Sequence, residues 1–136
     1  MSVSGNTPCP CHSGERYKRC CRPLHQGKSA PDPERLMRSR YAAYALGEVV
    51  YIQETTDPTG PQYQRDLVAW ADELREWCAA TQFLGLKIVD RVVQGDTAWV
   101  QFHATLRSNG RDASFGERSA FTLLNGRWRY HSGTPR

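Results

Sequence analysis

The sequence predicts an α+β fold, in which three helices are followed by an antiparallel sheet of about four strands. Between residues 33 and 81 the apolar side chains recur every three or four positions, whereas beyond Gly85 they alternate with polar ones. Dipeptides such as Asn109-Gly110 and Asn125-Gly126 separate the alternating segments, which is typical of strands joined in hairpins. The helices are therefore expected to pack over one face of the sheet.

The three helices are expected at residues 33–46, 48–55 and 62–81. Asp32 is a good N-cap for the first helix, Pro33 suits its first turn, and Gly47 favours a stop. The second, shorter helix should end before the breaker Asp57-Pro58. One face of the third helix is expected to carry Leu67, Trp70, Ala71, Leu74, Trp77 and Cys78.

The strands are expected to alternate apolar and polar residues, because successive side chains of a strand point to opposite faces. Gly95-Asp96 marks the turn after the first strand, and the two Asn-Gly pairs mark the later reversals. The expected inward-facing residues are Leu86, Ile88 and Val92 on the first strand, Ala98, Val100, Phe102, Ala104 and Leu106 on the second, Phe115, Phe121 and Leu123 on the third, and Trp128 and Tyr130 on the fourth.

The chain divides near residue 30, into an N-terminal module at residues 1–30 and an α+β domain at residues 31–136. Residues 9–21 hold four of the five cysteines and almost no aliphatic side chains, so they cannot build a hydrophobic core. The stretch from Arg22 to Pro33 is rich in Pro, Gly and Ser, as expected of a connector. A cross-link must therefore hold the N-terminal module together.

Cys9, Cys11, Cys20 and Cys21 offer four soft donors on one short loop, which favours a single tetrahedral metal ion. Ser13-Gly14 allows the loop to reverse. Two disulfides are the competing interpretation, but adjacent cysteines such as Cys20 and Cys21 pair only through a strained ring. Zinc is the expected metal and iron the alternative. Because four thiolates fill a tetrahedral shell, the ion should be structural, with His12 and His25 as solvent-exposed neighbours.

The segment CPCHSGERYKRCC resembles the SEC-C motif, a small metal-binding module found at the C-terminus of the preprotein-translocation ATPase SecA and on various bacterial proteins. The resemblance covers the cysteine pattern with Pro10, Ser13, Gly14, Tyr17 and Lys18. It implies that the metal ligands are Cys9, Cys11, Cys20 and Cys21. His12 stands where the motif usually has glycine.

Residues 34–46, ERLMRSRYAAYAL, and residues 117–133, ERSAFTLLNGRWRYHSG, resemble the YchJ-like (UPF0225) family. That family places a SEC-C motif before a domain of the NTF2-like fold. The resemblance implies a cone of three helices packed on a curved antiparallel sheet, which encloses a pocket. Such pockets serve enzymes as well as plain binding domains, so the fold alone does not assign a function.

Glu117 and Ser119 are the candidate pocket residues, because they interrupt the apolar face of the third strand. Arg38 or Arg40 is a candidate partner for the carboxylate, and Tyr130 offers a hydroxyl. The competing interpretation is a buried Glu–Arg brace between helix and sheet. The sequence contains no nucleophile–base pairing and no phosphate-binding glycine loop, which favours a role other than catalysis.

The positive charge of the chain is concentrated at its N-terminal end. The net charge is +4, and residues 1–40 hold eight Lys and Arg against three acidic residues. We therefore expect an adaptor that binds a protein or ribosomal partner. The alternatives are an NTF2-like ligand-binding protein or enzyme that uses a pocket near Glu117, and nucleic-acid binding through the basic N-terminal module. The candidate contact residues are Arg16, Tyr17, Lys18, Arg19 and Arg22. Since no apolar run could cross a bilayer and no secretory signal is recognisable, a cytoplasmic location is expected.

Overall fold

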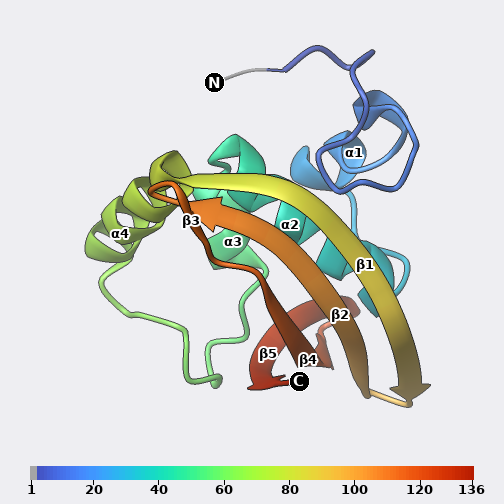
Figure 1. Ribbon diagram of the computed structural model, residues 1–136. Coiled ribbons are helices and arrows are strands. Elements are labelled where there is room, and N and C mark those ends of the chain that lie inside the picture. Colours follow the sequence, from blue (N-terminus) through green and yellow to red (C-terminus); the bar gives the residue numbers. More distant parts are fainter. Residues whose placement is uncertain (1–2) are drawn as a thin grey trace.

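The computed structural model describes residues 3–136 and has the expected α+β architecture. The curved sheet lies over helices α2 and α3, and the N-terminal module projects from one end of the molecule (Figure 1). The elements are the 3₁₀ helix η1 (Tyr17–Arg19), the helices α1 (Arg22–His25), α2 (Pro33–Leu46), α3 (Val49–Glu54) and α4 (Leu67–Ala80), and the strands β1 (Thr81–Gln94), β2 (Thr97–Ser108), β3 (Arg111–Asp112), β4 (Phe115–Leu124) and β5 (Arg127–Pro135).

Helix α2 has the predicted bounds because the sequence marks both of its ends. The Asp32 side chain accepts a hydrogen bond from the Arg35 backbone N–H at 2.8 Å. Gly47 adopts the left-handed conformation with φ 73°, which ends the helix without steric strain. Helix α3 differs from its predicted bounds by one residue at each end.

Helix α4 begins five residues later than predicted. Asp66 caps it by accepting from the Ala69 N–H at 3.0 Å, so the segment from residue 62 remains a loop. Strand β1 follows the helix directly from Thr81, whereas the sequence predicts its start beyond Gly85. Only part of the predicted apolar face of α4 is covered: Trp70 is buried, but Leu67 and Trp77 remain 47% and 41% exposed.

The main sheet is antiparallel with the strand order β1-β2-β4-β5, and the short strand β3 pairs with β2. Both Asn-Gly turns form as predicted, with positive φ at Asn109 and Asn125 and at the glycines that follow them. Strand β5 is tied to the end of α3, because the Tyr130 N–H donates to the Thr55 carbonyl at 2.8 Å. The sheet is thus anchored to the helical layer along this strand.

A β-bulge in β1 changes which face its side chains occupy. Ile88 pairs with Phe102 on the inner face, as predicted. The register then shifts between Ile88 and Asp90, so Val92 pairs with Trp99 on the outer face. The prediction that Val92 faces inward is therefore wrong, because one extra residue reverses the alternation.

The hydrophobic core lies between α2 and the concave face of the sheet. Leu36, Met37 and Tyr41 of α2 pack there against the inner side chains of β2, all five of which are buried as predicted. Phe121 and Tyr130 complete the core from β4 and β5. Among the described residues, no helix is long and apolar enough to span a membrane.

Candidate metal centre and ligand cavity

Cys9, Cys11, Cys20 and Cys21 bring their sulfur atoms into one buried cluster. The four Sγ atoms all lie within 4.8 Å of one another. Cys20 Sγ is 3.5 Å from Cys11 Sγ and 3.9 Å from Cys21 Sγ. A metal with M–S bonds of about 2.3 Å holds tetrahedral sulfurs about 3.8 Å apart, whereas a disulfide requires about 2.0 Å. The cluster can therefore hold one metal ion, and its cysteines are not joined as disulfides.

The loop that carries the cysteines reverses through two left-handed residues. Gly14 has φ 91°, as the Ser13-Gly14 turn predicts, and His12 has φ 61°. A left-handed conformation at position 12 explains why glycine suits this place and histidine is tolerated. The Cys9 N–H donates to the Glu15 carbonyl at 2.8 Å, which closes the loop. The His12 imidazole lies 3.2 Å from the Phe83 carbonyl, outside the sulfur cluster.

The thiols of the cluster influence one another's protonation. Hydrogen bonds from Cys21 and Cys9 lower the pKa of Cys11 far below its ordinary value. The hydrogen bond between Cys9 and Cys11 raises the pKa of Cys9 to about 12, and the hydrogen bond between Cys21 and Cys11 raises the pKa of Cys21. In the absence of a metal the cluster therefore favours a single thiolate, at Cys11. A bound cation would stabilise the thiolate form of all four cysteines.

Tyr17 and His25 lie inside the module, which corrects two predictions. Tyr17 is only 5% exposed and cannot contact a partner directly. Its hydroxyl lies 2.8 Å from His25 Nδ1, and His25 Nε2 lies 2.8 Å from the Ser39 carbonyl. Since a carbonyl can only accept, Nε2 carries the proton and Nδ1 accepts from Tyr17. His25 is thus half-buried rather than exposed, and burial lowers its pKa.

The module is docked on α2 by further hydrogen bonds to the cysteine loop. Arg38 Nη1 donates to the Cys11 carbonyl at 3.2 Å, and Arg35 Nη2 donates to the Cys20 carbonyl at 3.4 Å. Arg38 also pairs with Glu34 at 3.3 Å. The prediction that Arg38 lines the pocket is therefore wrong, because its side chain is directed to the metal centre.

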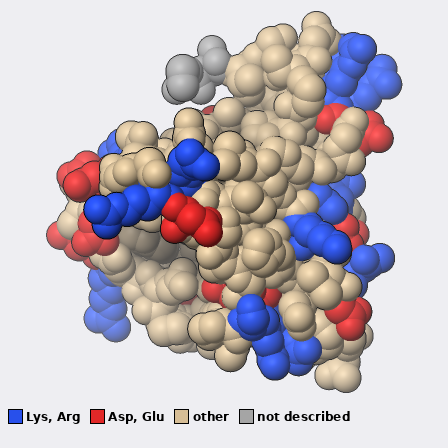
Figure 2. Space-filling view, in the orientation of Figure 1, with Lys and Arg blue, Asp and Glu red and all other residues tan. Residues whose placement is uncertain are grey.

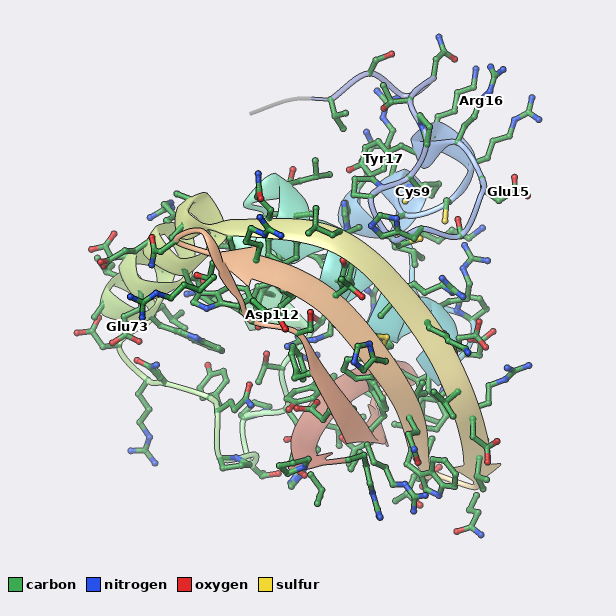
Figure 3. All side chains as sticks on the ribbon, viewed as in Figure 1. Cys9, Glu15, Arg16, Tyr17, Glu73 and Asp112 are labelled. Atoms are coloured by element: carbon green, nitrogen blue, oxygen red, sulfur yellow. The ribbon has the colours of Figure 1, made fainter. Side chains whose placement is uncertain are left out.

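Four basic residues of the module are exposed to solvent. Arg16, Lys18, Arg19 and Arg22 are all exposed, and Lys and Arg gather at this end of the molecule in Figure 2. Figure 3 shows Arg16 extending outward while Cys9 and Tyr17 lie within the loop. We refer to these four residues as the basic tip.

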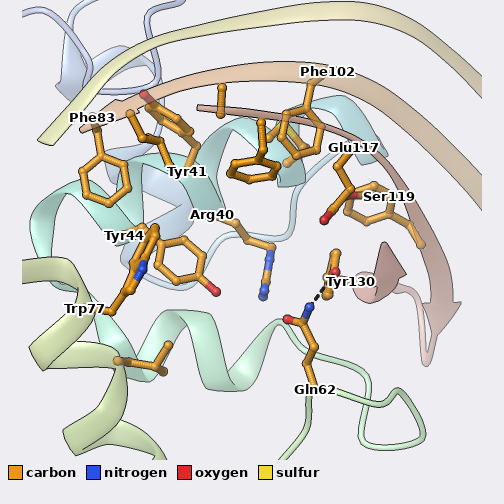
Figure 4. Close-up of a pocket in the computed structure, with 16 residues that line it drawn as sticks. Arg40, Tyr41, Tyr44, Gln62, Trp77, Phe83, Phe102, Glu117, Ser119 and Tyr130 are labelled. Atoms are coloured by element: carbon orange, nitrogen blue, oxygen red, sulfur yellow. Dashed lines mark hydrogen bonds between the residues drawn. The ribbon is translucent and has the colours of Figure 1, made fainter. Parts of the chain in front are cut away.

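A cavity of about 320 Å³ lies between the helices and the concave face of the sheet (Figure 4). Four of the predicted pocket residues line it: Arg40, Glu117, Ser119 and Tyr130. Residues that the sequence analysis missed also line it, among them Tyr44 and Gln62. The spacing of Met37, Tyr41 and Tyr44 on α2 would have indicated the first of these, because such residues share one helix face with Arg40. Gln62 lies in a loop and has no such signal.

Arg40 and Glu117 line the same cavity without forming an ion pair. The three ion pairs within residues 3–136 involve other residues, so the predicted Glu–Arg brace is absent from the described chain. Arg40 Nη1 donates to the Ile52 carbonyl at 3.0 Å, and the guanidinium carbon lies 4.7 Å from the centre of the Tyr130 ring. Burial, together with the charge of Glu117, raises the pKa of Tyr130.

Glu117 is held by Ser119 and by close packing against strand β5. The Ser119 hydroxyl donates to Glu117 Oε2 at 2.5 Å. The carboxyl group lies directly over Gly133, where a Cβ atom would overlap it. The carboxylate therefore has a defined position on the wall of the cavity.

Two family descriptions match the chain. Residues 6–23 match the SEC-C motif, and residues 32–133 match the family described as YchJ, middle NTF2-like domain. A UPF0225 protein of Deinococcus radiodurans is 41% identical over 125 residues, which cover 90% of this chain and 85% of the relative. A UPF0225 protein of Actinobacillus succinogenes is 38% identical over 129 residues, which cover 93% and 80%.

A solved structure agrees with the fold described above. The solution structure of a SEC-C motif-containing protein from Rhodopseudomonas palustris is similar with a TM-score of 0.80 and 39% sequence identity. The match covers 96% of this chain and 99% of that chain. The similarity therefore includes both the cysteine module and the cone.

Proposed function

The chain belongs to the UPF0225 (YchJ-like) family, with a SEC-C motif before an NTF2-like domain, and from this premise we propose that it is a non-catalytic adaptor. In this role, the metal fixes the basic tip and the tip binds an acidic surface of a protein or ribosomal partner. The proposal is supported by the different exposure of two sets of residues in the module. The cysteines are buried against α2, whereas the four residues of the basic tip, Arg16, Lys18, Arg19 and Arg22, face solvent.

A protein surface suits the basic tip better than a nucleic acid does. Single-stranded nucleic acids bind to aromatic platforms beside basic residues, but the tyrosine of the module is buried. Four thiolates and a divalent ion would together add a charge of about −2 beneath the tip. This charge lowers the attraction of the tip for every acidic partner, so the preference for a protein surface rests on the buried tyrosine.

Photo-crosslinking from position 15 of the full-length, metal-loaded protein in its host cells tests the adaptor role, because Glu15 is exposed beside the basic tip. We expect a discrete acidic partner that is lost in the variant R16Q/K18Q/R19Q/R22Q with the crosslinker at the same position. The variant R65Q/R75Q/K87Q/R107Q removes the same charge from exposed positions outside the module and should keep the partner. Equal crosslinking by both variants would contradict the adaptor role. Crosslinks that disappear after nuclease treatment, with steep salt dependence, would instead support nucleic-acid binding.

Zinc is proposed as the resident metal, because four thiolates in a tetrahedral arrangement suit it best. Four cysteine ligands leave no coordination position for a substrate, so the ion would act as a structural cross-link. Elemental analysis of reductively purified protein should return one zinc per chain. Finding iron, or no metal, would contradict this assignment.

A second candidate function is the binding of a small molecule, and the cavity beside Glu117 favours it. A volume of about 320 Å³ falls at the lower end of known ligand sites, which range from roughly 300 to 1,000 Å³. Native mass spectrometry of protein purified from its host should show a bound small molecule. The variant Ala104→Phe fills the cavity from its wall and should abolish the adduct, whereas an adduct that persists in it would contradict binding at this site.

A further inference from the structure

Arg40 is a buried cation whose charge is only partly satisfied by the protein. The residue is 6% exposed. Its Nη1 atom donates to the Ile52 carbonyl and to the hydroxyls of Thr55 and Thr56 at 2.7–3.1 Å. Within residues 3–136, the hydrogen bonds of 3.5 Å or less that Arg40 makes all come from Nη1, the Tyr44 hydroxyl lies beside the guanidinium, and no carboxylate pairs with it. Because a buried charge without a counterion is unfavourable, the other side of the guanidinium is suited to receive an anion.

The free side of Arg40 faces the cavity. The guanidinium extends between Tyr44 and Tyr130 (Figure 4). Tyr130 contributes a second donor there: its oxygen accepts from Gln62 Nε2 at 3.1 Å, which leaves its own proton available. Donors of a guanidinium and a phenol beside one another match the two oxygens of a carboxylate.

Glu117 adds an acceptor at the same polar end. The Ser119 hydroxyl occupies its Oε2 atom, whereas Oε1 has no hydrogen-bond partner in the described part of the chain. A ligand that carried only a carboxylate would leave this acceptor opposite a second negative group. A hydroxyl or amine next to the ligand's carboxylate would instead donate to Glu117.

The rest of the cavity is lined mostly by aromatic rings. Several of them meet edge to face, such as Trp77 with Tyr44 and with Phe83, at centroid distances of 5.6 and 5.5 Å. Flat apolar bodies pack well against such walls. Besides Tyr130, the ring-bearing residues of the wall are Tyr41, Tyr44, Trp77, Phe83, Phe102, Phe115 and Phe121.

We propose that the cavity binds a small carboxylic acid that has a ring-sized apolar body and a hydrogen-bond donor next to the carboxylate, as in an aromatic 2-hydroxy acid. The carboxylate is held by Arg40 and Tyr130, the donor by Glu117, and the apolar body by the ring-bearing wall. This inference rests on the proposed small-molecule function and names its ligand class.

Calorimetric titration of the full-length, metal-loaded protein with three matched probes tests the ligand class. Phenyllactate carries both groups, phenylpropanoate lacks the hydroxyl, and phenylpropanediol replaces the carboxylate by CH₂OH. We expect phenyllactate to bind tightest, phenylpropanoate roughly threefold to tenfold weaker, and the diol at least about tenfold weaker. These comparisons use only the wild-type chain and do not depend on the folding of any variant.

Variants then assign the two recognition elements. Arg40→Lys keeps the charge but loses the planar fork, and it should weaken phenyllactate binding roughly tenfold. Glu117→Met should remove the preference for phenyllactate over phenylpropanoate. Arg107→Gln, an exposed arginine of β2, is the control and should bind phenyllactate as the wild type does.

The possible outcomes separate the ligand class from the ligand-binding function. If the diol bound as tightly as phenyllactate, the cavity would still be a ligand site but the carboxylate class would be wrong. Equal binding of phenyllactate and phenylpropanoate would overturn the role of Glu117. If none of the probes bound while native mass spectrometry still showed an adduct that Ala104→Phe removed, the ligand class alone would fall.

Discussion

Gly133→Ala offers the sharpest test of how Glu117 is held. A Cβ atom at position 133 would overlap the carboxyl group of Glu117, and no other atom stands as close to it. The carboxylate is the end of a flexible side chain, so it would move away and release the backbone from strain. Ser119, which is 2% exposed and donates to this carboxylate, would then lose its partner. The substitution therefore acts through one hydrogen bond.

The expected effect depends on whether Glu117 is present. In the wild-type chain, an unpaired buried hydroxyl lowers the free energy of unfolding by about 1–2 kcal/mol. In a Glu117→Ala background the overlap is gone, and Gly133→Ala should be neutral or stabilise by about 0.5 kcal/mol, because alanine reduces the entropy of the unfolded chain. The sign of the effect should thus reverse between the two backgrounds.

Urea unfolding of the four proteins of this double-mutant cycle, at fixed free metal, measures the coupling. With an m-value of about 2 kcal/mol/M, the first substitution should lower the midpoint by roughly 0.5–1 M. Gly126→Ala is not a suitable control because Gly126 has a positive φ, whereas Ser132→Ala on the same strand changes no contact with Glu117. Equal effects of Gly133→Ala in both backgrounds would refute the packing of Glu117 over Gly133.

Three further predictions concern the metal and two buried polar groups. Removing the metal with a chelator should lower the Tm of the whole chain by roughly 5 °C or more. Amide hydrogen exchange should also become faster in α2 as well as in the module, because the module is hydrogen-bonded to α2. Faster exchange in residues 3–30 alone would contradict this. His25→Ala should destabilise the metal-loaded protein by about 1–3 kcal/mol, since the buried Tyr17 hydroxyl loses its acceptor and the Ser39 carbonyl loses a second donor. The exposed His103→Ala serves as control in the same thermal melts. Burial alone raises the pKa of Asp57, but hydrogen bonds from the Thr59 N–H, the Thr122 hydroxyl and the Thr59 hydroxyl lower it below its ordinary value. Its stabilising contribution is therefore complete above about pH 4 and is lost as the pH falls below that value. In the Asp57→Asn variant, urea titrations should show a smaller loss of unfolding free energy on acidification than in the wild type. The same pH dependence in both proteins would contradict this.

The parts of the fold that the sequence predicted are those with local causes. Asp32 begins α2 through its side-chain hydrogen bond to the Arg35 N–H, and Gly47 ends the helix through its left-handed conformation. The Asn125-Gly126 turn forms because both residues accept a positive φ. The bulge after Ile88 was missed because no glycine or proline marks it. The direct passage from α4 into β1 at Thr81 was missed for a similar reason, since no breaker separates the two elements.

The candidate sites were predictable to the extent that a residue's type determines its chemistry. Four cysteines on a short loop indicated the metal cluster, and polar residues on an apolar strand indicated Glu117 and Ser119 as cavity residues. Arg38 and Arg40 could not be distinguished in this way, because only their orientation on α2 separates them. Tyr17 was misplaced because a tyrosine among charged residues has no pattern that reveals burial.

Helix α2 connects the two candidate sites, because one of its faces contacts the cysteine module and another lines the cavity. Arg35, Arg38 and Ala42 lie three and four positions apart and contact the cysteine module. Met37, Arg40, Tyr41 and Tyr44 line the cavity from a different face of the helix. A rotation of α2 by one residue, about 100°, would turn both sets of side chains away from their sites, so the helix must keep one orientation for either site to form. The cysteine module contributes to that orientation, because the carbonyls of Cys11 and Cys20 accept hydrogen bonds from Arg38 and Arg35 of the helix. We therefore expect the packing of the module to influence the position of Arg40 in the cavity as well.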